Sequence, residues 1–303
     1  MTQLSQAILD RFQVRKTQKQ KDAFITLLKE HFPELSIQKG GFAKSRNLIL
    51  GDVSQAKIVL SAHYDTCAKL PFPNFIAPKN LLLSILYSIL IALPVVAVMF
   101  IISYLLNWLT QNFWVNYGVC VGICLVMIYL MLAGPANNHT ANDNTSGVIA
   151  LCELYSALTA EERTKVAAVF FDNEELGLLG SALFRKQYRK EIKDKLLINL
   201  DCVSDGDHFL VAVNKAARQH YYVQIKNAFT STDEKQILLE KAERVYYPSD
   251  QANFPMSIAV AALKHKKLLG YYMDRIHTKR DIIFDEKNIS FLTNALHKLI
   301  QLL

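Results

Sequence analysis

The sequence predicts an α/β sandwich around a mostly parallel sheet, interrupted by a transmembrane helical hairpin. After Gly147, short apolar segments alternate with longer helical ones, which is the pattern of a sheet covered by helices. Between Lys79 and Asp143, the chain of 303 residues contains no Asp, Glu, Lys or Arg. Several of the apolar segments end in carboxylates or histidines, and sites of open α/β sheets form at the carboxyl ends of strands.

The segment before the charge-free stretch is predicted to contain helix and short strands. Residues 1–32 have helical periodicity, with Phe24 and Leu28 among the apolar positions. The N-terminal residues lack the apolar core of roughly 7–15 residues that marks a signal peptide. Short strands, separated by turns that contain glycine, are expected at 35–38, 47–50 and 57–61.

The charge-free stretch is predicted to form two membrane-spanning helices, Leu81–Leu106 and Phe113–Gly134. As helices they would be about 39 Å and 33 Å long, and the hydrocarbon core of a bilayer is about 30 Å thick. Trp108 and Trp114 lie at the turn, where interfacial aromatic residues are common. The alternative is a buried helical pair in a soluble core. Such a pair normally has a polar stripe, and this stretch has none.

A hairpin returns the chain to the side from which it started. We therefore expect 1–79 and 135–303 to form one discontinuous domain, with 80–134 as the inserted hairpin. Lys69 and Lys79 precede the hairpin and its turn carries no positive charge, which predicts an integral membrane protein with its main domain in the cytoplasm. The hairpin also offers a surface for pairing of two copies.

The segment after the hairpin is predicted to alternate between helices and strands. Residues 256–263 are ambiguous, and 268–273 read as a strand before His277. The helices are expected at 148–158, 182–193, 216–229 and 288–303, and the strands at 166–171, 196–200, 209–213 and 237–239.

Composition excludes some classes of protein. The net charge is +7, but Lys and Arg are scattered and are not interleaved with aromatic residues, which argues against a nucleic-acid-binding surface. The number of cysteines is odd, five, and no pair has the CxxC spacing, so a reduced protein fits better than a disulfide scaffold. Side-chain alternation predicts that Cys202 points away from Asp201.

Two adjacent carboxylates, Glu174 and Glu175, follow the buried strand 166–171. Carboxylates at the end of a buried strand are costly unless a positive group lies beside them. A metal ion meets that need, because one carboxylate can bind it while the other moves a proton. The alternative is a solvated helix start, where acidic side chains are favoured by the helix dipole.

Other candidate ligands also fall at the ends of predicted strands. They are His63, Asp65, Asp143, Asp201 and His277, of which Asp143 precedes a helix. Two histidines with three or four carboxylates are the ligand set of a hydrolase that holds two zinc ions.

Six stretches along the chain combine these candidate residues with their neighbours: SAHYDT (61–66), NDNTSG (142–147), NEELGLLGS (173–181), INLDCV (198–203), PSDQANF (248–254) and RIHTKRD (275–281). In these stretches, and in their order, the chain resembles peptidase family M28, the di-zinc aminopeptidases. The resemblance implies a three-layer α/β/α sandwich with a mixed sheet, as in zinc exopeptidases.

The resemblance also assigns roles to residues. His63 and Asp201 would bind one zinc, Glu175 and His277 the other, and Asp143 would bridge the two. Glu174 would be the general base for the water between the metals, and Asp65 would orient His63. The residues do not distinguish Zn²⁺ from Co²⁺ or Mn²⁺.

The chain departs from the family in two places. His63 and Asp143 are 80 positions apart because the hairpin lies between them. Gln251 stands where the family often has a histidine, which affects substrate contacts and not the metal ligands. Tyr246 and Tyr247 are both candidates for a tyrosine that stabilises the oxyanion.

The expected function is that of a membrane-anchored zinc exopeptidase, most simply an aminopeptidase that acts on peptides with a free N-terminus. Three alternatives remain open: a carboxypeptidase-type enzyme, a glutaminyl cyclase-like enzyme, and a membrane receptor or scaffold that keeps the fold without catalysis. Because the hairpin leaves the chain between His63 and Asp143, we expect the site to lie close to the bilayer.

Overall fold

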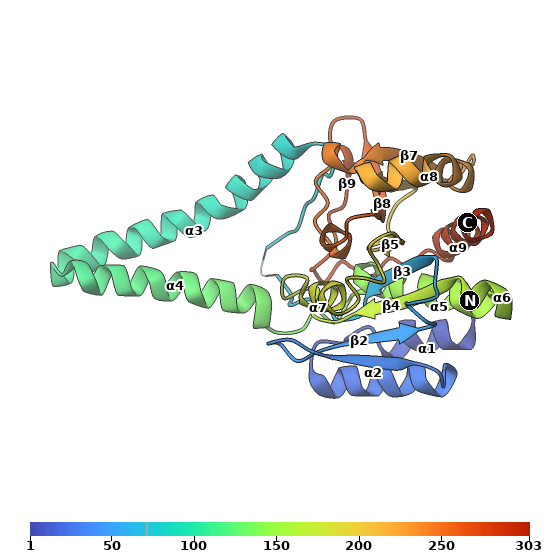
Figure 1. Cartoon of the computed structure of the whole chain (residues 1–303). Helices are drawn as coiled ribbons and strands as arrows, with labels where there is room; N and C mark the ends of the chain where they lie inside the picture. Colours follow the sequence, from blue (N-terminus) through green and yellow to red (C-terminus); the bar gives the residue numbers. More distant parts are fainter. Residues whose placement is uncertain (71) are drawn as a thin grey trace.

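The computed structural model describes residues 1–70 and 72–303, and its centre is a nine-stranded mixed sheet (Figure 1). The strand order is β1-β2-β4-β3-β5-β8-β6-β7, and β9 pairs with β8. The strands are β1 (Ser36–Gly40), β2 (Ser45–Leu50), β3 (Ile58–His63), β4 (Val166–Phe171), β5 (Leu196–Leu200), β6 (His208–Val213), β7 (Gln236–Lys241), β8 (Ser257–Lys266) and β9 (Gly270–Tyr272).

The four central strands, β4, β3, β5 and β8, run parallel to one another. Antiparallel pairings occur outside them, where β2 joins β4 and β6 joins β8. The mixed sheet is confirmed, with the parallel pairings concentrated at its centre. Because β3, β4 and β5 are parallel neighbours, the residues that follow them meet at one edge of the sheet.

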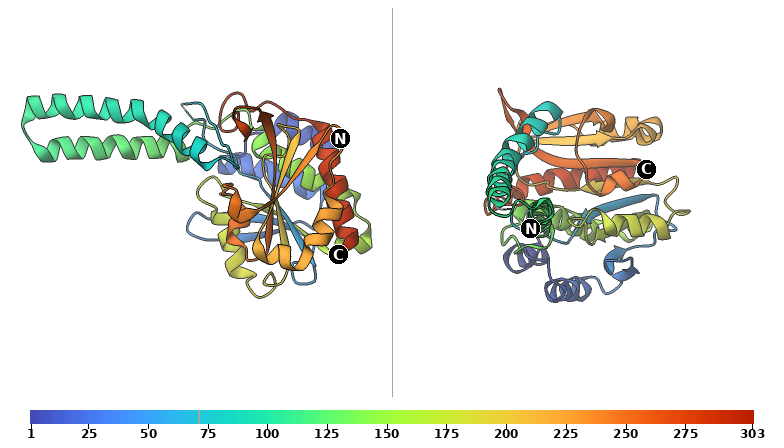
Figure 2. Two further views of the ribbon diagram at one scale, coloured as in Figure 1. Left: turned by 90° about the horizontal axis from the view of Figure 1, so that it is seen from above. Right: turned by 90° about the vertical axis from the view of Figure 1, so that its left-hand side faces the viewer.

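Helices cover both faces of the sheet, as Figure 2 shows, so the α/β/α sandwich is confirmed. Strand β4 is buried on both sides: Ala168 and Phe170 face one hydrophobic cluster, and Val169 and Phe171 face the other. Helix α7 (Leu179–Gln187) packs on the second face through Phe184. The first face carries α1 (Gln3–Arg11), α2 (Gln18–His31), α5 (Gly147–Ala157), α8 (Lys215–Ala228) and α9 (Glu286–Leu302).

Some elements differ from the sequence prediction. Residues 1–32 form two helices, because Thr17 and Gln20 make a capping box that begins α2 after an irregular connection. Helix α7 ends at Gln187, earlier than the predicted end at residue 193. The short helix α6 (Ala160–Thr164) was not predicted, although Thr159 and Glu162 form a capping box at its start.

The charge-free stretch forms helices α3 (Leu81–Thr110) and α4 (Phe113–Ala133), which project from the body as a hairpin (Figure 1). Both are long and apolar enough to cross a membrane, and none of their residues is buried. At the base, Tyr87 Oη donates to the carbonyl of Pro73 at 2.6 Å, and Lys16 Nζ donates to the carbonyl of Leu132 at 2.8 Å. The hairpin is therefore attached to the body through its base.

Candidate metal centre

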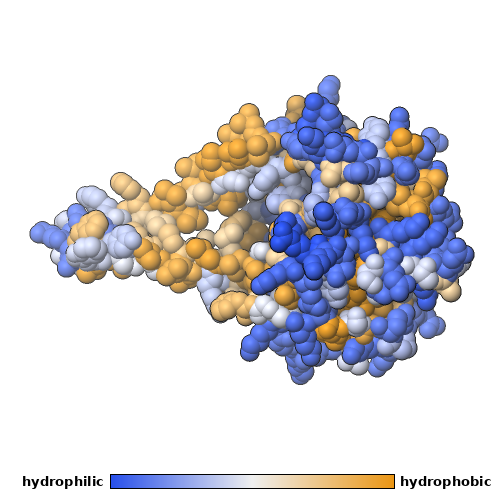
Figure 3. Space-filling model, in the orientation of Figure 1, coloured by the Kyte–Doolittle hydropathy of each residue, from blue (hydrophilic) through white to orange (hydrophobic). Residues whose placement is uncertain are grey.

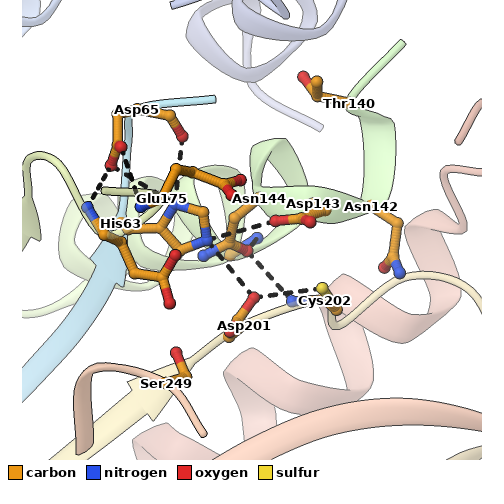
Figure 4. Close-up of polar contacts among 12 residues, drawn as sticks. His63, Asp65, Thr140, Asn142, Asp143, Asn144, Glu175, Asp201, Cys202 and Ser249 are labelled. Carbon is orange, nitrogen blue, oxygen red and sulfur yellow. Dashed lines mark hydrogen bonds and ion pairs between the residues drawn. The ribbon is translucent and has the colours of Figure 1, made fainter. Parts of the chain in front are cut away.

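His63, Asp143 and Asp201 come together at the carboxyl edge of the sheet (Figure 4). His63 is the last residue of β3, Asp201 follows β5, and Asp143 lies in η1 (Ala141–Ser146), the turn before α5. His63 Nε2 lies 3.3 Å from Asp143 Oδ1 and 3.5 Å from Asp201 Oδ1. All three side chains are buried, so their charges are removed from water.

A second group shares Asp143. His277 Nε2 lies 2.9 Å from Asp143 Oδ2 and 3.5 Å from Glu175 Oε2. Glu175 is in the loop after β4, and His277 lies in the loop after β9. The two oxygens of Asp143 thus face different histidines, which is the placement that a bridging carboxylate needs.

The donor atoms of both groups are spaced as the ligands of a metal ion are. Two ligands bound at about 2.0–2.2 Å to one tetrahedral zinc lie about 3.3–3.6 Å apart. The four histidine–carboxylate distances in the two groups are 2.9, 3.3, 3.5 and 3.5 Å. Glu175 Oε1 is buried without a hydrogen-bond partner among the described residues, so a ligand atom is left free. Imidazole and carboxylate donors suit zinc, and the residues fit it.

The electrostatics of the cluster also favour a cation. Burial and the neighbouring charge of Asp143 raise the pKa of Glu175 to about 8. Burial disfavours the charged form of His277, but Glu175 and Asp143 outweigh it and raise the pKa of His277 to about 10. Too many carboxylates share one buried space, and a bound cation relieves their repulsion.

Asp65 connects the two groups. Its Oδ1 and Oδ2 accept from the backbone N–H groups of Glu174 and Glu175, at 3.0 and 3.2 Å. Its Oδ1 also lies 3.7 Å from His63 Nδ1. One buried carboxylate therefore fixes the loop that carries both glutamates and faces the ring of His63 (Figure 4).

Glu174 lies beside His63 and Glu175 and lines the cavity at this edge of the sheet. Its carboxylate has no hydrogen-bonded partner among the described side chains, although its backbone N–H donates to Asp65. Burial and the charge of Glu175 raise the pKa of Glu174 well above its ordinary value, against the opposing effect of His63. A carboxylate with a raised pKa that faces a cavity is placed to accept and return a proton.

Two residues that support the site were not predicted from the sequence. Asp281 accepts from the backbone N–H groups of Asn142 and Asp143, at 2.8 and 3.0 Å, and so holds the turn that carries Asp143. Arg15 is completely buried and donates to the carbonyl of Tyr64 and to Thr145 Oγ1. Asp281 falls inside the matching stretch 275–281, but no local pattern marks Arg15.

The three candidate substrate contacts are placed differently. Tyr247 lines the cavity and donates through Oη to the carbonyl of Asp201 at 3.1 Å. Tyr246 also lines the cavity and is more than half exposed. Gln251 donates to the carbonyl of Tyr247 and accepts from Asn199, so its amide is engaged within the protein.

Two cysteines lie close to the cluster. The prediction that Cys202 points away from Asp201 is wrong: its Sγ lies 3.2 Å from Asp201 Oδ1. The reason is that Cys202 lies beyond the end of β5 with φ of +58°, where strand alternation no longer holds. Cys67 is buried beside Asp143, Glu175 and His277, with the candidate ligand atoms of all four within 4.8 Å of one another.

Comparison with known proteins gives both sequence and fold matches. The sequence model of peptidase family M28 matches residues 127–297, which is more than half of the chain. No curated protein matches the chain. The LapA aminopeptidase of Legionella pneumophila has the same fold, with a TM-score of 0.56 at 13% identity over 99% of this chain and 67% of its own.

Two further structures show how widely this fold is used. Macrostomum lignano glutaminyl cyclase has a TM-score of 0.58 at 12% identity, covering 98% of this chain and 87% of its own. The TET1 peptidase of Pyrococcus horikoshii, which can assemble into a tetrahedron or a large octahedral shell, has a TM-score of 0.51 at 11% identity. The match covers 97% of this chain and 98% of that peptidase. At these identities the likeness shows a shared fold, and the family model supplies the relationship: the chain belongs to peptidase family M28.

Proposed function

We propose that the protein is a membrane-anchored, zinc-dependent aminopeptidase that removes N-terminal residues from peptides. The observation that carries this proposal is the position of Asp143, whose two carboxylate oxygens face His63 and His277 from between them. Glu174 lies beside this arrangement with a free carboxylate. A shared carboxylate, terminal ligands on each side and one free base are what two-metal hydrolysis of an amide requires.

The proposed ligands divide into two sets. His63 and Asp201 would hold one zinc, Glu175 and His277 the second, and Asp143 would bridge them; Co²⁺ or Mn²⁺ would suit the same donors. When bound, the metal would supply Lewis-acid polarisation of the scissile carbonyl and a water of lowered pKa.

The side chains of the chain itself would do the proton transfer and the positioning. Glu174 accepts the proton of the attacking water and then donates it to the nitrogen of the leaving amine. Asp65 keeps the backbone of Glu174 in place through its hydrogen bond to that N–H. Tyr246 and Tyr247, and not Gln251, are the better placed candidates to contact a substrate, because both line the cavity.

We further propose that α3 and α4 anchor the protein in a membrane and that residues 1–79 and 135–303 form one catalytic domain on a single side. Exposed apolar helices of this length, without a charged residue, are stable in a bilayer and not in water. Lys16 contacts the end of α4, and Lys79 precedes α3, so positive charge gathers at the base and favours the cytoplasmic side.

The test is zinc content together with hydrolysis by the detergent-solubilised wild type and Glu174→Gln. We expect about two zinc ions per chain in both proteins, and turnover reduced by about 10²–10⁴-fold in the variant, because the general base is lost while the ligands remain. Full activity of Glu174→Gln would refute the role of Glu174.

The substrate panel separates the reactions that the fold supports. The matched peptides differ in their ends: one has a free amine, one has a blocked amine, and one has a blocked amine with a free C-terminus. Only the peptide with the free amine should be hydrolysed. Activity restricted to the free C-terminus would replace the aminopeptidase by a carboxypeptidase. Cyclisation of N-terminal glutamine without hydrolysis would replace it by a cyclase, and absence of both metal and activity would leave a scaffold.

A further inference from the structure

A single cavity joins the candidate metal centre to the hairpin. Its volume is about 600 Å³, and its inner end is formed by His63, Asp143, Glu174, Glu175 and Asp201. Its outer end is formed by side chains of α3 and α4, and Figure 3 shows the hollow between the hairpin and the body with apolar residues along its border. The metal centre therefore opens toward the hairpin.

The hairpin contributes a continuous wall to this cavity. The lining residues of α3 recur at intervals of three and four, so they form one face of the helix. Met127 and Met131 of α4, four residues apart, line it from the other side. The lining residues of α3 are Ser84, Tyr87, Ser88, Ile91, Ala92, Val95 and Val96.

This wall lies at the depth of one leaflet if the hairpin spans a bilayer. Asn107, near the end of α3, is the first amide side chain within this helix. Twenty residues of helix cross the hydrocarbon core of about 30 Å, so counting back from Asn107 places the near boundary at Tyr87. The body contacts α3 at this level through the hydrogen bond from Tyr87 to Pro73. The wall from Tyr87 to Val96 then extends about 14 Å into the leaflet next to the catalytic domain.

The mouth of the cavity is held in shape by packed aromatic rings. Phe75 stacks on Tyr272 of β9 at 5.6 Å between ring centroids and contacts Tyr87 of α3 at 5.3 Å. Phe75 thus connects the sheet to the hairpin beside the cavity. These ring contacts support the passage from the metal centre to the helices.

We propose that the substrates are amphiphiles whose free amine and scissile amide lie at the metal centre and whose apolar remainder lies between α3 and α4, in the near leaflet. The inference rests on the proposed aminopeptidase function and names its substrate class. A charged ammonium stays at the inner, carboxylate-rich end, so the chain beyond the scissile bond must follow the cavity toward the hairpin. A volume of about 600 Å³ is that of a site for a drug-sized ligand, larger than one side chain requires.

The probes are leucyl alkylamides with ethyl, hexyl and dodecyl chains, hydrolysed by the zinc-loaded full chain in nanodiscs. Each buried methylene adds binding energy, so kcat/KM should rise at least about tenfold from the ethyl to the dodecyl amide. A dodecyl chain also partitions into the bilayer, and variants are needed to separate partitioning from binding in the cavity.

Ala92→Trp fills the wall, and Leu93→Trp is its matched control at the same depth on a face that does not line the cavity. The ratio of dodecyl to ethyl kcat/KM should fall about tenfold in Ala92→Trp and stay as in the wild type in Leu93→Trp, because partitioning into the bilayer is the same for all three proteins. Val96 lies one turn deeper than Ala92, about 6 Å along the helix. Val96→Trp should therefore lower kcat/KM only for longer alkyl chains than those affected by Ala92→Trp. Zinc content verifies that each variant is folded.

The outcomes distinguish the two levels of the proposal. Hydrolysis of every leucyl amide with no dependence on chain length would overturn the amphiphile and leave the aminopeptidase. A dependence on chain length that is as strong in both Ala92→Trp and Val96→Trp as in the wild type would show that the apolar chain lies elsewhere, and would overturn the inference in the same way. No hydrolysis of any leucyl amide by the zinc-loaded protein would overturn the aminopeptidase and the inference together.

Discussion

The hairpin and the carboxyl edge of the sheet differ in composition, because the first is apolar and the second is rich in charged side chains. In both regions, however, the side chains lie in surroundings of the opposite polarity. The hairpin exposes side chains that a soluble protein buries, such as Phe100 and Trp108, which are 73% and 72% exposed. The edge of the sheet buries charges that a soluble protein exposes, such as His63 at 1% and Asp143 at 3%. Each region inverts the usual distribution of polar and apolar groups.

Each arrangement carries a cost in free energy. Exposed apolar surface costs about 25 cal/mol per Å² in water, and a buried carboxylate without a partner costs several kcal/mol. A bilayer removes the first cost, and a bound cation removes the second. Under the proposed function, both regions therefore have partners outside the chain, the bilayer and the metal, and the cavity between them links the two.

Removal of the metal should have the largest effect and should act on one region alone. Chelation is expected to abolish hydrolysis and to lower the free energy of unfolding by about 4 kcal/mol, when zinc had been present at 1,000 times its dissociation constant. Added zinc should restore both. Calorimetry and zinc analysis measure this, while the membrane-bound fraction should not change. An unchanged melting temperature after verified removal of zinc would contradict a stabilising metal.

A charge in the hairpin should act on the other region alone. Val98 lies near the middle of α3 and is exposed, so Val98→Lys should make the apparent insertion free energy less favourable by about 2.5–3.5 kcal/mol. Asn107→Lys, near the polar turn, is the control and should insert as the wild type does. An insertion assay in microsomes reports both values. Equal values for the two variants would contradict a membrane-spanning α3.

Asp65→Asn should have an intermediate effect on the metal centre. The amide has only one acceptor oxygen, so the N–H of Glu174 or of Glu175 loses its partner, and the negative charge beside His63 disappears. We expect zinc affinity and kcat/KM to fall about 10–100-fold. Asp52→Asn, which changes a surface carboxylate hydrogen-bonded to Ser54, is the control. If both variants bind zinc equally well, Asp65 does not position the ligands.

The central strands could be predicted from sequence because their local signal is strong. The predicted ranges 166–171 and 196–200 coincide with β4 and β5, whose residues are buried on both faces and form apolar runs. The N-terminal break was missed because helical periodicity continues across it. The capping residues Thr17 and Gln20 were a readable signal of that break.

The site shows a similar division between local and long-range information. The candidate residues could be found because each follows or precedes a recognisable element. The resemblance to family M28 selected five of them as ligands, and the structure brings all five together. Asp281 and Arg15 could not be found in this way. Asp281 acts on Asn142 and Asp143 from about 140 positions away, and Arg15 contacts Tyr64 and Thr145, so only the tertiary fold reveals their contacts.

The smallest effect is expected at Glu162, in a region that depends on neither partner. Its hydrogen bonds to the backbone N–H of Thr159 and to His297 lower the pKa of Glu162 to about 2 from an ordinary 4.5. Because the pKa is lower in the folded protein, the stabilisation is present above about pH 4.5 and is lost as the pH falls through 2. Glu162→Gln should therefore lower the melting temperature slightly at pH 7 and less at pH 3.

Glu161→Gln, the neighbouring change in the same helix, is the control and should show a smaller loss at both pH values. Melting curves of the chelated and the zinc-loaded protein should give the same difference between wild type and Glu162→Gln, because α6 precedes the start of β4 and the candidate metal ligands lie at the opposite, carboxyl edge of the sheet. A difference that does not change between pH 7 and pH 3 would mean that the negative charge of Glu162 does not stabilise α6.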